Sequence, residues 1–403
     1  MKISFKNGPR KQGVPLEDWQ NWSWQMRHAL RTESDFAAVF NLTDEERKGF
    51  AGAGSVFQIR STPYYAALAS PHVSEDPIRK ILMPTYQELN RGLQEMLDPL
   101  GERQPQNHPA SRIIHRYPDR VLFLVTDTCS VYCRYCTRKH FTGADQAFMK
   151  ASEYDQALSY IKKKTGIREV ILSGGDPLTL SDGNIERILS DLRSIEHVEI
   201  IRVGSRMPVV CPMRLTPGLV AILRRHQPVF MMTHFNHPRE ITREAADALG
   251  LLVDHGIPVF NQLVLLNGIN NSAALIQALS RRLLFLRVKP YYMFQCDPSE
   301  GTDHLRTSVE NSLEIQRELW GRLSGLAMPN LALDIPSGGG KAGLVPNFQV
   351  HREGQKRSFT GWDGVSADYL SPVQNEMRTP LDAEEYDAEW ASLKNAKNEN
   401  DTL

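Results

Sequence analysis

The chain has 403 residues, of which 41% are hydrophobic and 23% are charged, which is the composition of an ordinary globular protein. Its 47 basic and 47 acidic residues give a formal net charge of +0, which argues against a nucleic-acid-binding protein. The sequence shows no apolar signal segment and no apolar run long enough to cross a bilayer. With five cysteines and no export signal, we expect a cytoplasmic protein that binds neither nucleic acid nor membrane.

Residues 1–110 are predicted to form an N-terminal helical region. A helix is expected to start after Pro15, over LEDWQNWSWQMRHAL, and it carries three tryptophans. Tryptophans on such a helix are more often packing residues than binding residues. The proline-containing stretch 101–111 then separates this region from the next one.

From about residue 115, short apolar runs alternate with amphipathic segments. Near-continuous Val/Ile/Leu runs joined by helices are typical of parallel strands that are buried on both faces. Six such units predict an α/β fold with a barrel or partial (β/α)6 barrel over 111–295. In such barrels the chemistry lies in the loops that follow the carboxyl ends of the strands. The predicted strands are 121–128, 168–176, 198–206, 228–236, 258–267 and 283–294.

The C-terminal region, 296–403, is predicted to begin with a helix at about 306–324. A glycine-rich stretch at 336–343 and a short β-like segment follow, and the last 20 or so residues are polar. We expect the end of this polar tail to be frayed.

Three of the five cysteines, Cys129, Cys133 and Cys136, lie within eight positions, directly after the first predicted barrel strand. This spacing indicates a metal ion or an iron–sulfur cluster. Structural zinc needs four protein ligands, and His140 could supply the fourth. A cluster held by only three cysteines would instead leave one iron open for a substrate or cofactor. A zinc site has no reason to lie at the mouth of a barrel strand, so the cluster is favoured.

CxxxCxxC with an aromatic residue before the last cysteine resembles the signature of the radical S-adenosylmethionine (radical SAM) enzymes. In that family the open iron of a [4Fe-4S] cluster chelates SAM, and one electron cleaves SAM to a 5′-deoxyadenosyl radical. The electron would come from a carrier such as flavodoxin or ferredoxin. SGGD, at the end of the second predicted strand, resembles the family's GGE-type motif, which implies that Gly174, Gly175 and Asp176 contact SAM. Without the cysteines, the two glycines would indicate only a turn.

The glycine-rich stretch PSGGGKAG (336–343) is not a P-loop. That motif would need glycine at 335 and serine or threonine at 342, where the chain has Ile335 and Ala342. A lysine in a flexible glycine run suits a Schiff base, because the amine must reach a carbonyl group and later be released. By the glycine run alone, a solvated loop lysine is the better interpretation of Lys341.

Seven sequence blocks that follow one another along the chain resemble the lysine 2,3-aminomutase family. The similarity runs from about residue 15 to about 370. The family carries pyridoxal 5′-phosphate (PLP) on the GGGK lysine. It moves the α-amino group of L-lysine from C2 to C3 to give β-lysine, an isomerase reaction that regenerates SAM. The blocks are HRYPDR (115–120), CSVYCRYCTRK (129–139), LSGGDPL (172–178), VGSRMPVV (203–210), THFNHP (233–238), QCDPSEG (295–301) and DIPSGGGK (334–341).

The resemblance implies a role for particular residues of this chain. Lys341 would carry PLP, and Cys129, Cys133 and Cys136 would hold the cluster. Arg138 would bind the substrate carboxylate, because an arginine can pair with a carboxylate through two hydrogen bonds. The other implied contacts are Asp297 and Asp334 for the distal ammonium group of lysine, Arg116 and Arg120 for PLP, and Ser205 and Arg206 for SAM or PLP.

Other functions stay open from the sequence. The same machinery could act on another amino acid such as arginine, or could make β-lysine for the modification of a translation factor. A different class would be a non-catalytic zinc or iron–sulfur protein. We also expect a homo-oligomer, but the zinc cysteines that tie subunits together in the best-known family members are missing after Cys296.

Overall fold

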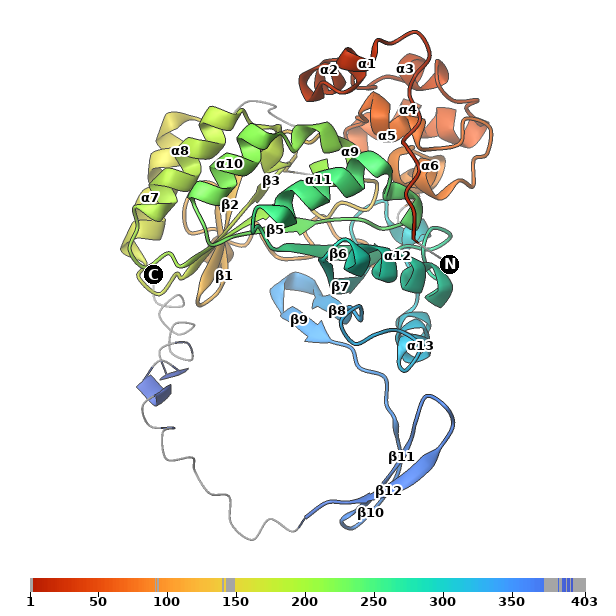
Figure 1. Cartoon of the computed structure of the whole chain (residues 1–403), viewed down its shortest axis with the longest axis vertical. Helices are drawn as coiled ribbons and strands as arrows, with labels where there is room; N and C mark the ends of the chain where they lie inside the picture. The colour runs from red at the N-terminus through yellow and green to blue at the C-terminus, as the bar shows by residue number, and fades with distance from the viewer. Residues whose placement is uncertain are drawn as a thin grey trace.

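The structure is a computed structural model that describes residues 3–90, 92, 94–139, 141–142, 149–372, 383, 386–388, 390–391 and 393. Its N-terminal part is helical, as predicted, and Figure 1 shows these helices beside the end of the barrel at α9 and α11. The N-terminal helices are α1 (Leu16–Trp19), α2 (Trp22–Arg27), α3 (Glu33–Ala37), α4 (Asp44–Val56), α5 (Pro63–Ala67) and α6 (Pro77–Leu82).

The single helix expected after Pro15 is in fact two short helices, α1 and α2. The helix breaks at Asn21, whose side chain accepts a hydrogen bond from the backbone N–H of Trp24 and so caps α2. The tryptophans pack as expected, since Trp19 is buried and its ring lies 6.4 Å from that of Tyr64.

One nine-stranded sheet forms the centre of the molecule, in the strand order β1 to β9. Strands β2 to β8 are parallel, whereas β1 and β9 are the antiparallel edge strands. The strands are β1 (Ile113–Tyr117), β2 (Arg120–Thr126), β3 (Glu169–Gly174), β4 (Ile200–Gly204), β5 (Val229–Thr233), β6 (Val259–Leu265), β7 (Val288–Gln295), β8 (Asn330–Ile335) and β9 (Gly340–Gly343).

Helices connect the parallel strands and lie against the outside of the sheet (Figure 1). The six predicted strands correspond to β2 to β7, and β8 adds a seventh parallel strand that the pattern analysis did not include. The connecting helices are α7 (Ala151–Lys163), α8 (Asp182–Arg193), α9 (Met207–Val210), α10 (Pro217–Arg225), α11 (Arg243–Asp254), α12 (Ala273–Phe285) and α13 (Val309–Leu319).

The last predicted barrel strand, 283–294, began too early. Residues 283–285 belong to α12, where Leu283 is fully buried on the inner face of the helix. The chain then turns at Arg287, which has a positive φ of 62°, and β7 starts one residue later. A run of apolar residues that crosses a helix–strand junction cannot be divided by periodicity alone.

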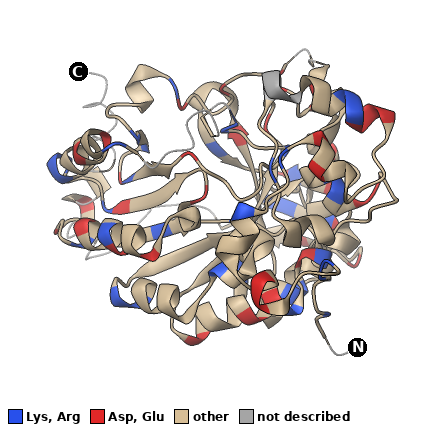
Figure 2. Cartoon of the chain, turned by 90° about the horizontal axis from the view of Figure 1, so that it is seen from above, with Lys and Arg blue, Asp and Glu red and all other residues tan. Residues whose placement is uncertain are grey.

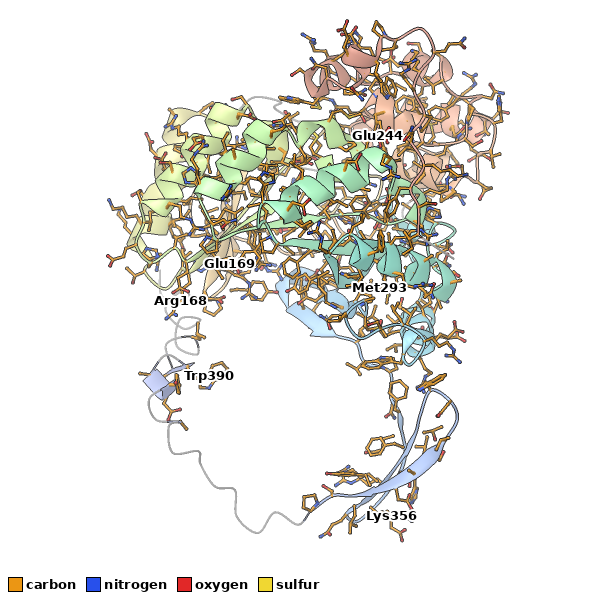
Figure 3. All side chains as sticks on the ribbon, in the orientation of Figure 1. Arg168, Glu169, Glu244, Met293, Lys356 and Trp390 are labelled. Carbon is orange, nitrogen blue, oxygen red and sulfur yellow. The ribbon has the colours of Figure 1, made fainter. Side chains whose placement is uncertain are left out.

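A second, three-stranded antiparallel sheet follows the barrel. Figure 1 shows it standing away from the nine-stranded sheet, and Figure 3 places Lys356 on it and Met293 inside the barrel. Its β11–β12 turn contacts the segment that follows α13, where the guanidinium group of Arg322 lies 5.8 Å from the ring of Trp362. Its strands are β10 (Gln349–Glu353), β11 (Lys356–Thr360) and β12 (Ser366–Leu370).

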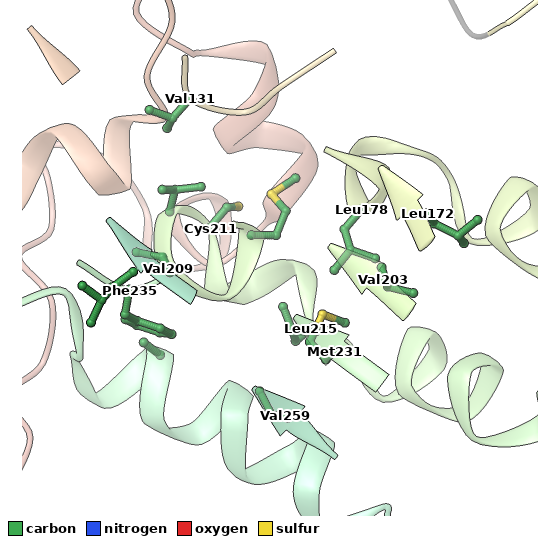
Figure 4. Packing of buried hydrophobic residues seen from close by; sticks show 14 of the residues in the cluster. Val131, Leu172, Leu178, Val203, Val209, Cys211, Leu215, Met231, Phe235 and Val259 are labelled. Carbon is green, nitrogen blue, oxygen red and sulfur yellow. The ribbon is translucent and has the colours of Figure 1, made fainter. Parts of the chain in front are cut away.

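The hydrophobic core lies between the sheet and its helices. Figure 4 shows Val203 and Met231 on neighbouring strands packing toward Leu215 and Leu178, and Cys211 lies in the same apolar cluster. In Figure 2, the ribbon positions of basic and acidic residues are interspersed along the chain. Among the helices that the structure describes, none is long and apolar enough to span a bilayer.

Candidate active site

A cavity of about 570 Å³ opens where the parallel strands end. It collects residues from strand ends, strands and loops that are far apart in the sequence. Every site residue predicted from the sequence lines it, namely Arg116, Arg120, Cys129, Cys133, Cys136, Arg138, Gly174, Gly175, Asp176, Ser205, Arg206, Asp297, Asp334 and Lys341.

The loop that carries the three cysteines follows β2 and is held by the N-terminal helices. The backbone N–H of Tyr132 donates to the carbonyl of Arg60, and that of Arg134 donates to Ile81. The buried guanidinium group of Arg134 pairs with both carboxylate oxygens of Glu88, with Nε 2.8 Å from Oε1. The N-terminal region therefore shapes the cysteine loop.

The three cysteines are free thiols, and the fit to an iron–sulfur cluster rests on their common surroundings. Burial raises the pKa of Cys129 well above its usual range, and the neighbouring Cys136 and Cys133 raise it further. Burial and Cys133 likewise raise the pKa of Cys136 to about 11. All three thiols come from one loop and line the same cavity, which fits the three-thiolate donor set of a cluster.

The alternative of a zinc site involved His140, which lies outside the described residues. Among the residues that the structure does describe, no three His, Cys, Asp or Glu side chains meet around a single metal ion, the three cysteines included. A four-iron cluster does not require this, because each cysteine binds a different iron, whereas a structural zinc ion does.

Gly174 and Gly175 are required by the protein's own packing. Gly174 has a φ of +114°, and a Cβ on it would lie 2.3 Å from the carbonyl oxygen of Thr126. A Cβ on Gly175 would lie 2.2 Å from the carbonyl oxygen of Thr128. The two glycines thus let the end of β3 pack against the backbone that leads into Cys129.

The carboxylate of Asp176 joins the ends of β3 and β4. One oxygen accepts hydrogen bonds from Leu178 N at 3.0 Å and Ser205 Oγ at 2.7 Å, and the other accepts from Arg206 N at 2.8 Å. Burial raises the pKa of Asp176 despite these bonds. Its carboxylate therefore supports the loops on both sides of it.

Strand register places Lys341 beside Asp334. The two residues are direct partners in the antiparallel pairing of β8 with β9, and Lys341 Nζ lies 2.9 Å from Asp334 Oδ1 and 3.2 Å from Oδ2. The glycines before the lysine form a tight turn, in which Gly338 and Gly340 have φ values of 97° and 82°. The expected flexible run is therefore a hairpin turn that fixes where Lys341 emerges.

Arg138 has an acidic partner that sequence reasoning missed. Its Nε lies 2.7 Å from Glu102 Oε2 and its Nη2 lies 2.5 Å from Oε1, while Nη1 donates to Ser173 Oγ at 3.3 Å. Glu102 is buried in the stretch that was expected to be only a connection between regions. Glu102 thus occupies the edge of the guanidinium group formed by Nε and Nη2. A substrate carboxylate would have to approach the edge formed by Nη1 and Nη2.

Asp297 follows β7 and its pKa is raised from 3.8 to about 7. Burial is the main cause, and the negative charge of Asp334 adds to it, whereas Lys341 acts in the opposite direction. Asp297 and Asp334 thus repel each other within one cavity. A single cation bound between the two carboxylates would relieve this repulsion.

Two arginines from the β1–β2 hairpin lie near the opening. Arg116 keeps its Nε and Nη2 buried without a hydrogen-bond partner. Arg120 stacks on Tyr117, with its guanidinium carbon 4.0 Å from the ring centroid, and pairs with Asp119. Two buried, unpaired N–H groups of an arginine that lines the same cavity as Lys341 fit the phosphate of PLP.

Similarity to known proteins agrees with this geometry. A model of the radical SAM superfamily matches residues 123–276, from β2 into α12. The fold and the cysteine site therefore define a radical SAM enzyme. A second model, described as lysine-2,3-aminomutase, matches residues 316–402.

Several characterised relatives cover most of the chain. The L-lysine 2,3-aminomutase of Clostridium subterminale is 43% identical over 88% of this chain and 85% of its own length. That of Bacillus subtilis is 42% identical over 92% and 78%, and the glutamate 2,3-aminomutase of Clostridioides difficile is 39% identical over 86% and 82%. The chain belongs to the lysine 2,3-aminomutase family.

Membership of this family confirms the predicted fold class and enzyme class. The protein is an isomerase of the radical SAM type, and its cofactors are a [4Fe-4S] cluster, SAM and PLP. The family also contains an enzyme named for glutamate, so the charges of the cavity matter for the substrate.

Proposed function

We propose that this enzyme converts L-lysine to β-lysine by moving the α-amino group from C2 to C3. The observation that carries the proposal is the pair of carboxylates, Asp297 and Asp334, in the same cavity as Arg138 and Lys341. Two carboxylates suit a substrate with a second cation, whereas the side-chain carboxylate of glutamate would be repelled.

Each charged residue has a task in this proposal. When bound, the cluster with SAM supplies a hydrogen-abstracting radical and PLP supplies a ring that delocalises the unpaired electron. Arg138 orients the α-carboxylate of the substrate. Asp334 pairs with Lys341 Nζ in the structure. The distal ammonium group of the substrate would take the place of this amine beside Asp334, and Asp297 would pair with the same cation.

The remaining predicted residues hold the cofactors. The cysteines Cys129, Cys133 and Cys136 bind the cluster, and Arg116 and Arg120 bind the phosphate group of PLP. Gly174, Gly175, Asp176, Ser205 and Arg206 form the wall against which SAM lies. Support for these roles comes from their places around one cavity.

Arginine is the second candidate substrate, because its guanidinium group can also pair with the two carboxylates. The test offers L-lysine, L-arginine, L-glutamate and L-alanine separately to anaerobically reconstituted enzyme with PLP, SAM and a one-electron reductant. Chiral chromatography then detects each β-isomer. β-Lysine as the main product supports the proposal, whereas turnover of another amino acid would contradict the substrate assignment.

We also propose the setting in which the enzyme works. Its reductant would be a one-electron carrier of the flavodoxin or ferredoxin class, and its compartment would be the reducing cytoplasm, since all five cysteines are free thiols. The enzyme would be a homo-oligomer, which the exposed apolar side chains of the β10–β12 sheet support. Leu370 on β12 is 71% exposed, and Val365, in the turn that leads into β12, is 65% exposed.

A further inference from the structure

Arg206 connects one cysteine of the site to a buried acidic group. The residue follows β4, is only 8% exposed, and donates from Nη1 to Cys133 Sγ at 2.9 Å. Its Nη2 donates to Glu240 Oε1 at 2.7 Å and to the hydroxyl oxygen of Tyr65 at 2.8 Å. The guanidinium group therefore lies between the cysteine sulfur and a carboxylate.

This guanidinium group is fixed in place from both sides. The backbone N–H of Arg206 donates to Asp176 Oδ2 at 2.8 Å. The second oxygen of Glu240 accepts from the backbone N–H groups of Asn236 at 2.6 Å and His237 at 3.0 Å, so the carboxylate cannot turn away. Arg206 thus keeps its hydrogen bond aimed at Cys133, a contact that comes in addition to the SAM or PLP contact that the resemblance implied.

We propose that Arg206 sets the reduction potential of the iron–sulfur cluster, and that Glu240 limits its effect as the counter-charge. The inference rests on the cluster binding at Cys133, but not on the identity of the amino-acid substrate. Reduction adds one electron from the reductant to the cluster and breaks no bond. A hydrogen-bond donor with a positive charge at a ligating sulfur stabilises the more negative, reduced form, and so raises the potential.

The test compares the wild-type enzyme with R206Q, R206K and E240Q, all reconstituted anaerobically and checked for iron and sulfide content. Each is titrated with dithionite in the presence of redox mediators, and electron paramagnetic resonance of the reduced cluster gives the midpoint potential. Neither PLP nor an amino acid is needed, so the result is independent of the substrate assignment.

R206Q should lower the potential. At the potential where half of the wild-type clusters are reduced, the ratio of reduced to oxidised cluster should fall about tenfold, which corresponds to about 59 mV for one electron. E240Q should shift the potential in the opposite direction, because the positive charge of Arg206 is then no longer balanced. R206K keeps the charge and should lie between R206Q and the wild type.

The two opposite charge changes separate tuning from damage to the fold, because R206Q and E240Q break the same buried ion pair. Unchanged potentials in both variants, or shifts in the same direction, would overturn the proposal. Loss of the cluster from R206Q and R206K alone would also overturn it, in favour of a role in holding the cysteine loop.

Discussion

The register of a two-stranded hairpin decides where Lys341 acts. Replacing Lys341 with alanine should abolish the absorption band of lysine-bound PLP and all turnover, because no other amine takes its place opposite Asp334. Lys356→Ala is the matched control, since Lys356 is a half-exposed lysine on β11 that pairs with Asp368. Absorption spectra of both variants, reconstituted with PLP, make the comparison. A persisting band in Lys341→Ala would place the cofactor on another residue.

The pKa of Asp297 predicts how activity depends on pH. Burial and the charge of Asp334 raise this pKa to about 7, so the carboxyl group is neutral below that pH and ionised above it. Only the ionised form can pair with the distal ammonium group. As pH falls below 7, kcat/KM for lysine should therefore decrease about tenfold per pH unit. The test compares profiles of kcat/KM against pH for the wild type and Asp297→Asn. The variant should lack the decrease below pH 7, and the same decrease in both enzymes would assign it to another group.

Much of the site could be predicted from single residues, and the exceptions have a physical cause. The cysteines lie in a compact motif whose spacing itself indicates the chemistry, whereas the role of Lys341 comes from the family resemblance of the GGGK block. Glu102 is 36 residues from Arg138, and only the folded chain brings the two together. The bond from Arg206 to Cys133 was missed for the same reason.

The junction between β3 and the cysteine loop depends on glycine. Gly175→Ala would place a Cβ 2.2 Å from the Thr128 carbonyl oxygen, and the backbone there must move. We expect a loss of about 1–3 kcal/mol in the free energy of unfolding, together with weaker iron retention. Gly183→Ala is the control, because a Cβ there meets nothing within 4 Å. Denaturant unfolding and iron content measure both effects, and equal results for the two variants would refute this role of Gly175.

The contact between the N-terminal helices and the cysteine loop rests on a buried ion pair. Arg134→Met should cost about 3–5 kcal/mol of unfolding free energy, because Glu88 is left as an unpaired buried charge. The double variant R134M/E88Q should cost less than the two single changes added together. Lys48→Met removes an exposed pair with Glu45 and should cost about 0.5 kcal/mol or less. Additive losses in denaturant titrations would mean that the pair is not coupled.

At the level of elements, periodicity located the six strands β2 to β7, placed one helix–strand junction wrongly and missed β8. Leu283 has the same apolar character whether it ends α12 or begins β7, and the turn at Arg287 has no sequence signal of its own. The break at Asn21 was readable in principle, since asparagine is a good helix cap. Strand β8 pairs with β7 and so extends the sheet, and its carboxyl end brings Asp334 to the cavity.

The β10–β12 sheet is where we expect subunits to meet. If the enzyme is the homo-oligomer proposed above, replacing both Val365 and Leu370 with aspartate should convert it to a monomer, because charges would then occupy the exposed apolar surface. The control replaces exposed Leu326, which lies outside this sheet, with aspartate. Analytical ultracentrifugation of the three proteins gives the answer. An unchanged oligomeric state in the double variant would mean that the subunit interface lies on another surface.

At the scale of the whole molecule, the barrel encloses a cavity in which cofactors and substrate would meet. The central proposal is that nitrogen moves there from C2 to C3 of L-lysine. The most direct measurement uses L-lysine labelled with ¹⁵N at the α-amino group, followed by ¹³C and ¹⁵N NMR of the product. The proposed reaction predicts that the label is bonded to C3 and absent from C2. A β-amino group without label, or no β-lysine from enzyme with intact cluster and bound PLP, would contradict it.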